Sequence, residues 1–588
     1  MGLIKINEQE IVFEGEKTVL ELARENNIHI PALCYYKECS HKGICGICLI
    51  EIDGKDAKVF RACVTKAEDG MIVTSESDFI KAEVKKELAK ILNNHDFKCG
   101  FCKRKESCEL LKLVREIKAI PDERKDYSDK SDYVDDRSSS LVIDRSRCVK
   151  CGRCVASCSV KTTTKSILFH ETDNGERIIG ARDLKCFDDT GCLLCGQCLI
   201  SCPVDALQEK SHIERVLEAL EDEDKHVIVC MAPSVRAALG EEFNMGFGVD
   251  VTKKTYTALR MLGFDKVFDL NFAADVTIME EASELIDRLS NGGTLPMFTS
   301  CCPGWIRLIE LHFPELIGNL STTKSPMGIF GAASKYYYPK ISGIPAKDVY
   351  TVSIMPCIVK KFEMERPEME NFGERGIDAV LTTREFARIL KSKKIDFKNL
   401  EDGEADPSMG EYTGAGAIFG ATGGVMEAAL RTAKDVIENK DLEDIEYTEI
   451  RGFKGVKEST INIAGTDHKV AVINGASNFF KFVEEGNLAK GYTLIEVMDC
   501  PGGCVNGGGQ PFVSSKIREE VDYVKMRASV LYNQDEKALP KRKSHDNIAM
   551  QKMYDILGNK PGEGIAHELF HTKYHDRGYK SNKNGNIL

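Results

Sequence analysis

Cysteines arranged in repeated short groups constrain this chain more than any other feature of its sequence. Two runs share the spacing C-x2-C-x2-C-x3-C, and the second begins 44 residues after the first. The runs are Cys148, Cys151, Cys154 and Cys158, then Cys192, Cys195, Cys198 and Cys202, which is followed by Pro203. The chain has 588 residues and 23 cysteines, an odd number in a long chain, which favours metal-bound thiolates over a disulfide framework.

The repeated spacing is typical of bacterial ferredoxins with two 4Fe-4S clusters, in which the fourth cysteine of each run binds the other cluster. We therefore assign one cluster to Cys148, Cys151, Cys154 and Cys202. The other cluster takes Cys192, Cys195, Cys198 and Cys158. Structural zinc also suits four thiolates, but the duplicated spacing favours iron–sulfur clusters. The first run lacks the trailing proline and has Ser159 there.

Two further groups precede these runs. The first is a variant of the plant-type 2Fe-2S spacing, made of Cys34, Cys45, Cys48 and Cys63. Cys39 competes as its first ligand, and Cys34 is preferred because the variant resembles the N-terminal domain of the large iron–sulfur subunit of complex I. The second group has the spacing H-x3-C-x2-C-x5-C and predicts a third accessory 4Fe-4S cluster with one imidazole ligand. It consists of His95, Cys99, Cys102 and Cys108, for which a zinc knuckle is the alternative.

The rest of the sequence divides into units by its patterns. We expect domains over residues 1–79, 80–125, 140–210 and 211–588, and a polar linker over 121–140. The first unit is predicted to contain a hairpin (2–6 and 11–13) and a helix over 18–26, and 80–97 has helical periodicity. Later apolar runs predict mostly parallel buried strands over 226–231, 296–299, 350–354, 469–473 and 493–497. The C-terminal cysteines lie just beyond such strands, where ligands bind in α/β folds.

Bulk properties exclude several partners. The net charge of −12 argues against nucleic acid. No signal peptide is visible, and no apolar run approaches the roughly 18 residues that a membrane helix needs. A reducing cytoplasm is therefore the expected location, with no membrane partner.

Five cysteines of the C-terminal half lie in three short motifs. These are T-S-C-C-P-G-W over 299–305, I-M-P-C over 354–357 and C-P-G-G-C-V-N-G-G-G-Q-P over 500–511. Together and in this order they resemble the three signatures of FeFe-hydrogenases. The resemblance extends over essentially the whole chain, including the four-cluster N-terminal extension of the long monomeric clostridial enzymes. It implies reversible reduction of protons to molecular hydrogen with electrons from a ferredoxin or similar carrier.

The resemblance also implies a multidomain α/β and α+β fold. Its parts would be a plant-type ferredoxin β-grasp, a His/Cys cluster domain, a bacterial two-cluster ferredoxin and a two-lobed α/β H-cluster domain with a helical tail. The H-cluster is a 4Fe-4S cubane joined to a two-iron subsite with CO, cyanide and a bridging dithiolate. Carried over, its ligands are Cys302, Cys357, Cys500 and Cys504, of which Cys504 bridges to the two-iron subsite. The residues implied to cradle that subsite are Pro233, Ser234, Lys360, Met355, Met498, Phe419 and Gly420. Maturation proteins and a monomeric state are expected with it.

A route for protons is implied as well. It runs through Cys301, Glu281, Ser321 and Glu284, and Arg288 would hold its outer end by pairing. A thiol and buried carboxyls can exchange protons near neutral pH. From composition alone, Glu281 and Glu284 would instead belong to a solvated acidic helix face.

Two rival functions remain open at this point. A complex-I-like electron-transfer subunit would explain residues 1–210 but leaves the C-terminal cysteines without a role. A hydrogenase-like iron–sulfur assembly protein would keep a related fold without turning over hydrogen, but this class lacks the long N-terminal extension.

Several residues fall outside these assignments. Four positions depart from the family pattern and are expected to affect redox potential and oxygen tolerance more than the reaction: Met327, Ile358, Val359 and Asp499. Three thiols are expected to be plain buried residues: Cys39, Cys186 and Cys230. Residues 567–571 match the H-E-x-x-H zinc motif of metalloproteases, with His575 as the nearest further histidine. We expect this segment to be structural, because the third-ligand spacing of metzincins is absent.

Overall fold

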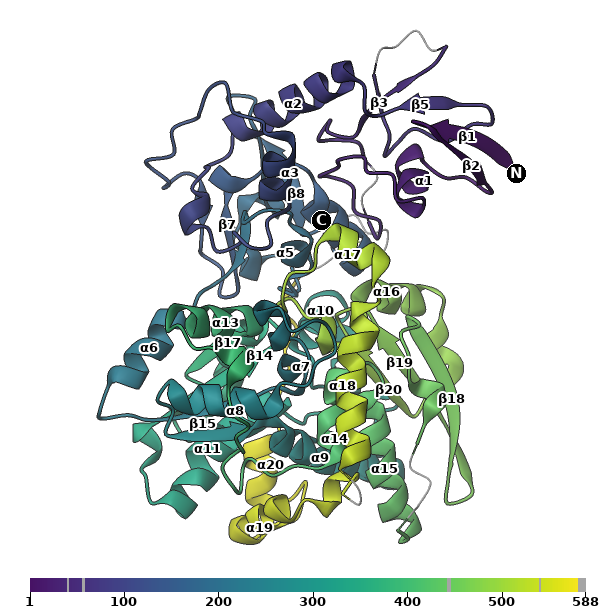
Figure 1. Cartoon of the computed structure of the whole chain (residues 1–588). Helices are drawn as coiled ribbons and strands as arrows, with labels where there is room; N and C mark the ends of the chain where they lie inside the picture. Colours follow the sequence, from purple (N-terminus) through teal and green to yellow (C-terminus); the bar gives the residue numbers. More distant parts are fainter. Residues whose placement is uncertain (40–41, 55–58, 442–445, 539–540, 580–588) are drawn as a thin grey trace.

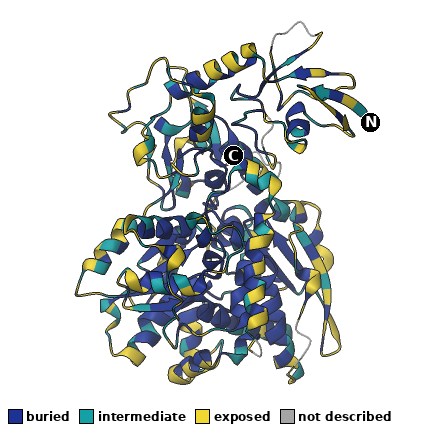
Figure 2. Cartoon of the chain, in the orientation of Figure 1, coloured by how far each residue is buried: buried dark blue, intermediate teal, exposed yellow. Residues whose placement is uncertain are grey.

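The computed structural model describes residues 1–39, 42–54, 59–441, 446–538 and 541–579. The cysteine-rich N-terminal units form one end of the molecule and the α/β part forms the other (Figure 1). Buried residues are concentrated in the middle of the α/β part (Figure 2).

The first unit is a five-stranded sheet with one helix. Its elements are β1 (Gly2–Ile6), β2 (Gln9–Phe13), α1 (Val19–Glu25), β3 (Leu49–Ile52), β4 (Phe60–Arg61) and β5 (Ile72–Thr74). The strand order is β2-β1-β5-β3-β4, and β1 pairs with β2 in the predicted antiparallel hairpin. Thr18 and Glu21 begin α1 with a capping box, in which each side chain accepts the backbone amide of the other. The loop between α1 and β3 holds three of the predicted 2Fe-2S ligands.

The second unit consists of two helices, α2 (Asp78–Asn93) and α3 (Glu109–Ile117). The predicted helix over 80–97 is shorter at its C-terminal end, because Asn94 caps it and places His95 in the following loop. The predicted linker over 121–140 is also more ordered than expected. It contains β6 (Val134–Asp135), which pairs with β7 (Leu141–Asp144).

The internal repeat appears as two matching half-units. Each cysteine run leads into one turn of helix, α4 (Arg153–Ser157) or α5 (Gln197–Ser201). Gly152 and Gly196 cap these helices with φ of 77° and 75°, a left-handed conformation that glycine adopts without steric penalty. A hairpin of β8 (Ile167–Glu171) and β9 (Arg177–Ala181) separates the halves, and β10 (Leu207–Glu209) returns to β7.

The α/β part has two sheets, one in each lobe. The first has the order β12-β11-β14-β17 with all strands parallel, and the second has the order β13-β20-β19-β18. In the second sheet only β18 runs antiparallel to its neighbour. The bounds in the first sheet are β11 (His226–Met231), β12 (Lys266–Asp269), β14 (Val349–Met355) and β17 (Ala379–Thr382). Those in the second are β13 (Met297–Phe298), β18 (Val456–Ile463), β19 (Thr466–Asn474) and β20 (Leu494–Met498).

All five predicted strands of this part are present, and most pair in parallel as expected. The strands β12, β17 and β18 were not predicted. They lie at sheet edges, as the predicted β13 does. The strand β12 has a charged residue at each end and β18 alternates between apolar and polar residues, so neither gives an apolar run, whereas β17 is buried throughout and was missed without such a reason. The prediction of a two-lobed part is consistent with the two separate sheets.

The long helix α9 (Leu270–Asn291) packs against α11 (Pro326–Ser342) and α15 (Gly424–Glu438). Its carboxylates do not form the solvated face that composition suggests. Glu280 and Glu281 are 0% and 1% exposed, so their chemistry is that of buried groups.

The C-terminal segment runs along the α/β part and also reaches the N-terminal units. Its helices are α17 (Ser515–Glu520), α18 (Tyr523–Lys537), α19 (Ile548–Leu557) and α20 (Gly564–Phe570). Glu519 of α17 pairs with Arg24 of α1, and Ser515 donates to Glu109 of α3 at 2.8 Å. Within the described ranges, no helix is both long and apolar enough to cross a membrane.

Candidate active site and metal centres

A cavity between the two lobes collects the C-terminal cysteines. Its walls include Cys301, Cys302, Cys357, Cys500 and Cys504. Cys357 follows β14 of the first sheet, whereas Cys302 and Cys500 follow β13 and β20 of the second. The carboxyl ends of both sheets therefore face one site, as expected for ligand binding in α/β folds.

The glycines of the third motif allow the backbone to close around this cavity. A Cβ on Gly507 would lie 2.4 Å from the Pro356 carbonyl oxygen, and one on Gly508 would lie 2.3 Å from that of Cys195. Gly503 has φ of +91° and would place a Cβ 2.7 Å from the Thr422 amide nitrogen. Side chains at these positions would push apart the segments that carry the cysteines.

The residues predicted to cradle the two-iron subsite line the same cavity. They are Pro233, Ser234, Met355, Lys360, Phe419, Gly420 and Met498. Most of this wall is apolar, and Lys360 supplies its ammonium group. The Lys360 Nζ lies 2.7 Å from the Glu363 Oε2 and donates to the Ser325 Oγ at 2.8 Å. This pairing raises the pKa of Lys360 although burial opposes it, so the side chain stays cationic.

Of the predicted proton-route residues, Cys301 lines the cavity, and the others lie on α9 and in the loop before α11. Burial and then the charge of Glu281 raise the pKa of the Cys301 thiol. Burial raises the pKa of Glu281 to about 7, which suits a group that exchanges protons near neutrality. Its Oε1 accepts the Ser300 amide at 3.0 Å, and its buried Oε2 has no hydrogen-bond partner among the residues that the structure describes.

The outer half of this route is a connected set of hydrogen bonds. Ser321 donates to the Glu284 Oε2 at 2.8 Å. Arg288 donates to the Glu284 Oε1 at 2.6 Å, as the sequence predicted for the outer end. The structure thus brings Ser321, Glu284 and Arg288 together, and it places Glu281 one helical turn further inward.

The N-terminal cysteine groups also converge. The Cys45 amide donates to the Cys34 Sγ at 3.4 Å, and hydrogen bonds to Cys34 and Cys48 raise the pKa of Cys63. Cys39 lies apart from them: burial raises its pKa to about 11, and its charged neighbours are Lys161, Glu38, Arg153 and Arg518. This placement favours Cys34 over Cys39 as the first ligand.

His95 shares a small cavity with Cys99, Cys102 and Cys108. Its Nδ1 lies 3.0 Å from the Arg147 carbonyl oxygen, which leaves the Nε2 for a metal. The arrangement matches that of metal-binding histidines, whose second nitrogen is held by a backbone carbonyl.

The two ferredoxin-type runs exchange their fourth cysteines. Burial, and then the charges of Cys148, Cys151 and Cys202, raise the pKa of Cys154. Cys158 lines a cavity with Cys192, Cys195 and Cys198. Within the described ranges, no three His, Cys, Asp or Glu side chains are close enough to bind a single metal ion. The two runs have the spacing of thiolate sets that hold iron–sulfur clusters.

The comparisons with known proteins agree with this arrangement. Residues 225–508 match the family of the iron only hydrogenase large subunit, C-terminal domain, and 521–577 match the iron hydrogenase small subunit. Residues 3–78, 79–119 and 147–206 match a 2Fe-2S cluster binding domain, an iron hydrogenase 1-like iron–sulfur centre-binding domain and a 4Fe-4S dicluster domain.

Iron hydrogenase 1 of Clostridium pasteurianum is 58% identical over 576 residues, which cover 98% of this chain and 100% of the relative. The chain belongs to the FeFe-hydrogenase family. A subunit of the NADP-reducing hydrogenase of Solidesulfovibrio fructosivorans is 38% identical and covers 95% of this chain and 96% of its own length. The apo FeFe-hydrogenase of Chlamydomonas reinhardtii has a similar structure, with a TM-score of 0.56, 38% identity, and coverage of 62% of this chain and 99% of its own.

The chain is therefore an oxidoreductase that acts on hydrogen, with 2Fe-2S and 4Fe-4S domains and an H-cluster domain. Its donor set fits the cofactor, because four thiols and a buried cation surround a largely apolar cavity. The positions that depart from the family pattern lie in or near the active-site cavity. Met327, Val359 and Asp499 line the cavity, and Ile358 packs on Gly196 of the two-cluster unit. Burial raises the pKa of Asp499 to about 7.

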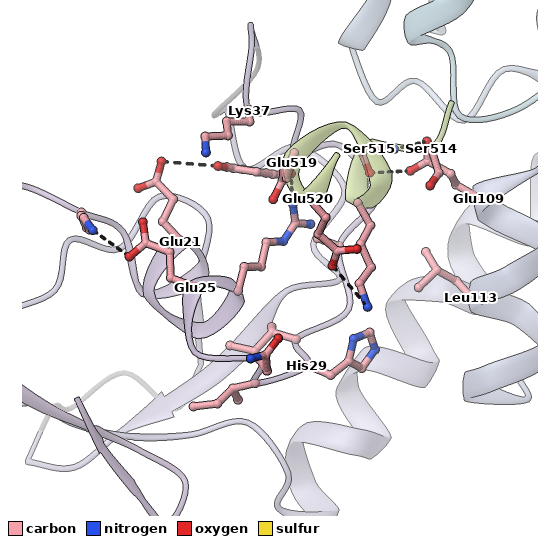
Figure 3. Close-up of a pocket in the computed structure, with 18 of the residues that line it drawn as sticks. Glu21, Glu25, His29, Lys37, Glu109, Leu113, Ser514, Ser515, Glu519 and Glu520 are labelled. Carbon is pink, nitrogen blue, oxygen red and sulfur yellow. Dashed lines mark hydrogen bonds and ion pairs between the residues drawn. The ribbon is translucent and has the colours of Figure 1, made fainter. Parts of the chain in front are cut away.

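A larger cavity of this hydrogenase, of about 670 Å³, lies away from the active site (Figure 3). It opens between α1, α3 and α17, where the first unit meets the rest of the chain. Its walls carry acidic and basic side chains, among them Glu25, His29, Glu109 and Glu519, and no cysteine. We regard it as a domain border and not as a reaction site.

The three cysteines without a role have different surroundings. Cys230 is buried in β11 with its Sγ 3.3 Å from the Ser353 Oγ, whereas Cys39 and Cys186 are only partly buried. The expectation of plain buried thiols therefore fits Cys230 alone. Sequence reasoning also missed Thr322 and His571. The Thr322 amide donates to Glu284 at the outer end of the predicted proton route. His571, about 250 residues further along the chain, contacts the Thr322 hydroxyl.

Proposed function

We propose that this hydrogenase interconverts protons, electrons and molecular hydrogen at an H-cluster held by Cys302, Cys357, Cys500 and Cys504. The observation that carries the proposal is the convergence of these four thiols on one cavity from both sheets. When bound, the two-iron subsite with its CO, cyanide and dithiolate ligands supplies the metal at which hydrogen forms or splits. Cys504 would bridge the cubane to that subsite.

The cavity wall would orient the cofactor and exclude water. Lys360 would offer charge-assisted hydrogen bonds to a cyanide nitrogen, and Pro233 and Ser234 begin α7 (Pro233–Arg236), which lines the same cavity. Met355, Met498, Phe419 and Gly420 provide the apolar surface. Gly420 is required there, because a Cβ would lie 2.2 Å from the Ser234 Oγ.

Protons would travel between the cavity and the surface through Cys301, Glu281, Ser321 and Glu284. Each of these groups can both accept and release a proton. Arg288 stays charged and positions the Glu284 carboxylate. Support comes from the raised pKa of Glu281, near 7, and from the hydrogen bond of Ser321 to Glu284.

Electrons would enter through one 2Fe-2S and three accessory 4Fe-4S clusters. We propose a β-grasp ferredoxin domain over 1–79, a His/Cys cluster domain over 80–125, a two-cluster ferredoxin domain over 140–210 and the H-cluster domain over 211–588. Cys195 stands closest to the active site, since its carbonyl contacts Gly508 and burial followed by Asp499 and Cys500 raises its pKa. The proposed partners are a ferredoxin-type carrier and maturation proteins for the two-iron subsite, with the enzyme a cytoplasmic monomer.

Infrared spectroscopy of the matured protein tests this proposal. We expect bands from metal-bound CO and cyanide together with hydrogen evolution from reduced ferredoxin. Cys504→Ser should lose the bands, and Cys186→Ser, a cysteine outside every group, should keep them. Protein that carries its accessory clusters but shows no such bands after maturation would instead match an electron-transfer subunit. Bands without hydrogen turnover would also contradict the proposed reaction.

A further inference from the structure

The C-terminal tail is paired with the segment that forms the outer end of the proton route. His571 forms an antiparallel bridge with Thr323. The Thr572 amide donates to the Thr322 carbonyl at 2.7 Å, and the Lys324 amide donates to the Phe570 carbonyl at 2.7 Å. The H-E-x-x-H helix therefore ends directly against residues 321–324, which include Ser321.

The His571 ring extends the hydrogen-bond network of Glu284. Its Nδ1 lies 2.7 Å from the Thr322 Oγ1. The Thr322 hydroxyl lies 3.3 Å from the Glu284 Oε2, and the Thr322 amide donates to the same oxygen at 2.9 Å. The Glu284 Oε2 thus accepts hydrogen bonds from Ser321 on the inner side and from Thr322 on the outer side.

The other nitrogen of His571 faces a second buried carboxylate. Its Nε2 lies 3.0 Å from the Glu280 Oε2, and the Glu280 Oε1 accepts the Tyr554 hydroxyl at 2.6 Å. A further titratable neighbour is His567, whose ring stacks on His571 with centroids 4.2 Å apart. The His571 side chain keeps 6% exposure, so one edge of it reaches solvent.

Arg288 cannot carry out this transfer. It binds the opposite oxygen, the Glu284 Oε1, and the carbonyls of Asn319 and Leu320. A guanidinium stays protonated in proteins, whereas an imidazole gains and loses protons near neutral pH. The contacts of Glu284 therefore divide between a fixed cation on one oxygen and a proton-exchanging chain on the other.

We propose that His571 exchanges protons with solvent and passes them through the Thr322 hydroxyl to Glu284, as a positioning and relay residue outside the cavity. In one step the Nδ1 proton moves to the Thr322 oxygen while the Thr322 hydroxyl proton moves to the Glu284 Oε2. The ring carries protons on both nitrogens before this step and keeps its Nε2 proton, which faces the Glu280 Oε2 at 3.0 Å. The Nδ1 that has lost its proton then takes one from solvent. The inference rests on the proposed route through Glu284 and Glu281.

His571→Ala in the matured holoenzyme tests the inference. With excess reductant, hydrogen evolution should fall about three- to tenfold, less than for a required acid–base group, because Glu284 keeps 13% side-chain exposure and solvent still reaches it. The solvent deuterium isotope effect should rise, the infrared bands should not change, and added imidazole should restore the rate. His575→Ala is the matched control, since His575 lies on the same tail and pairs with Glu368 instead.

Thr322→Val provides a second variant if His571→Ala loosens the tail. It removes the hydroxyl but leaves the backbone contacts of Thr322 to Glu284 and Thr572. We expect a similar loss that imidazole does not restore. Rates equal to the His575→Ala control in both variants would overturn the role of His571. Glu281→Gln separates the two proposals: an active Glu281→Gln variant would overturn the whole route, and an inactive one with unaffected His571→Ala would overturn only this extension.

Discussion

The N-terminal units and the α/β part hold their predicted metal ligands in opposite ways. In the N-terminal units most of each group comes from one short segment, as with Cys99, Cys102 and Cys108 between α2 and α3. In the α/β part the ligands follow β13, β14 and β20, and Cys302 and Cys504 are 202 residues apart in sequence. Local spacing therefore specifies the first kind of site, whereas only the complete two-sheet fold assembles the second.

The two regions also differ in how they attach to each other. The two-cluster unit shares an apolar core with the α/β part, in which Leu193 and Cys195 pack with Trp305. The first unit contacts α17 through polar contacts such as the Arg24–Glu519 pair, beside the cavity of Figure 3. Its Leu33, Ile47 and Leu49 pack in an apolar cluster with the second and two-cluster units. Salt screens such partly exposed charges more than it weakens an apolar core. Salt should therefore weaken the contact between the first unit and α17 more than the contact between the two-cluster unit and the α/β part.

Cys301→Ala should give the largest effect. It should impair the function of the α/β part and leave the N-terminal units unaffected. A methyl group cannot carry a proton, so turnover should fall by about 10²-fold or more, within the range for acid–base groups. All clusters and the infrared bands should remain, because Cys301 is not a proposed ligand. Hydrogen evolution near the wild-type rate with reductant in excess would exclude this thiol from the route.

His95→Ala should affect the N-terminal region and leave the α/β part unaffected. It removes the imidazole whose Nδ1 is held by the Arg147 carbonyl, and we expect the loss of one 4Fe-4S cluster while the other clusters persist. Iron analysis and electron paramagnetic resonance measure this directly. Activity with a small artificial reductant should be reduced less than activity with ferredoxin. A full cluster complement in the variant would contradict the assignment of His95.

Glu281→Gln should change the pH dependence of stability. Burial raises the pKa of Glu281 to about 7 from a usual value of 4.5, so the folded state keeps a proton that the unfolded chain releases. Stability from this group is present below the unfolded pKa and is lost as the pH rises toward 7, by roughly 1.4 kcal/mol per pH unit. Wild type should therefore lose stability between pH 6 and pH 8, whereas the neutral variant should not. The stability of the variant minus that of wild type should be larger at pH 8 than at pH 6.

Thermal unfolding of the holoenzyme at both pH values, at one scan rate, checks this sign. Glu284→Gln is a useful comparison, since Glu284 is paired with Arg288 and its removal leaves that cation without its partner. The Glu284→Gln substitution should destabilise the protein at both pH values. A Glu281→Gln variant that is equally destabilised at pH 6 and pH 8 would contradict a raised pKa.

The same contrast explains what the sequence could predict. The strand ends carrying Cys302, Cys357 and Cys500 follow from short apolar runs, because those strands are buried on both faces. The strands β12 and β18 were missed because charged or polar residues interrupt their apolar pattern, and β17 was missed although it is buried throughout. The burial of Glu280 could not be foreseen either: its partners Tyr554 and His571 come from the tail, 274 and 291 residues away. Local patterns contain no information on such contacts.

His567→Ala should give the smallest effect and sharpen the distinction between the two histidines of the H-E-x-x-H motif. His567 is exposed and stacks on His571, but no side-chain hydrogen bond in the described part of the chain joins it to the proton route. Its loss should leave hydrogen evolution, iron content and zinc content near wild type. Metal analysis and rate measurements beside His571→Ala check this. Stoichiometric zinc that disappears in the variant would show a metal site at this helix, whereas a loss equal to that of His571→Ala would mean that the proton enters through the stacked pair and not through His571 alone.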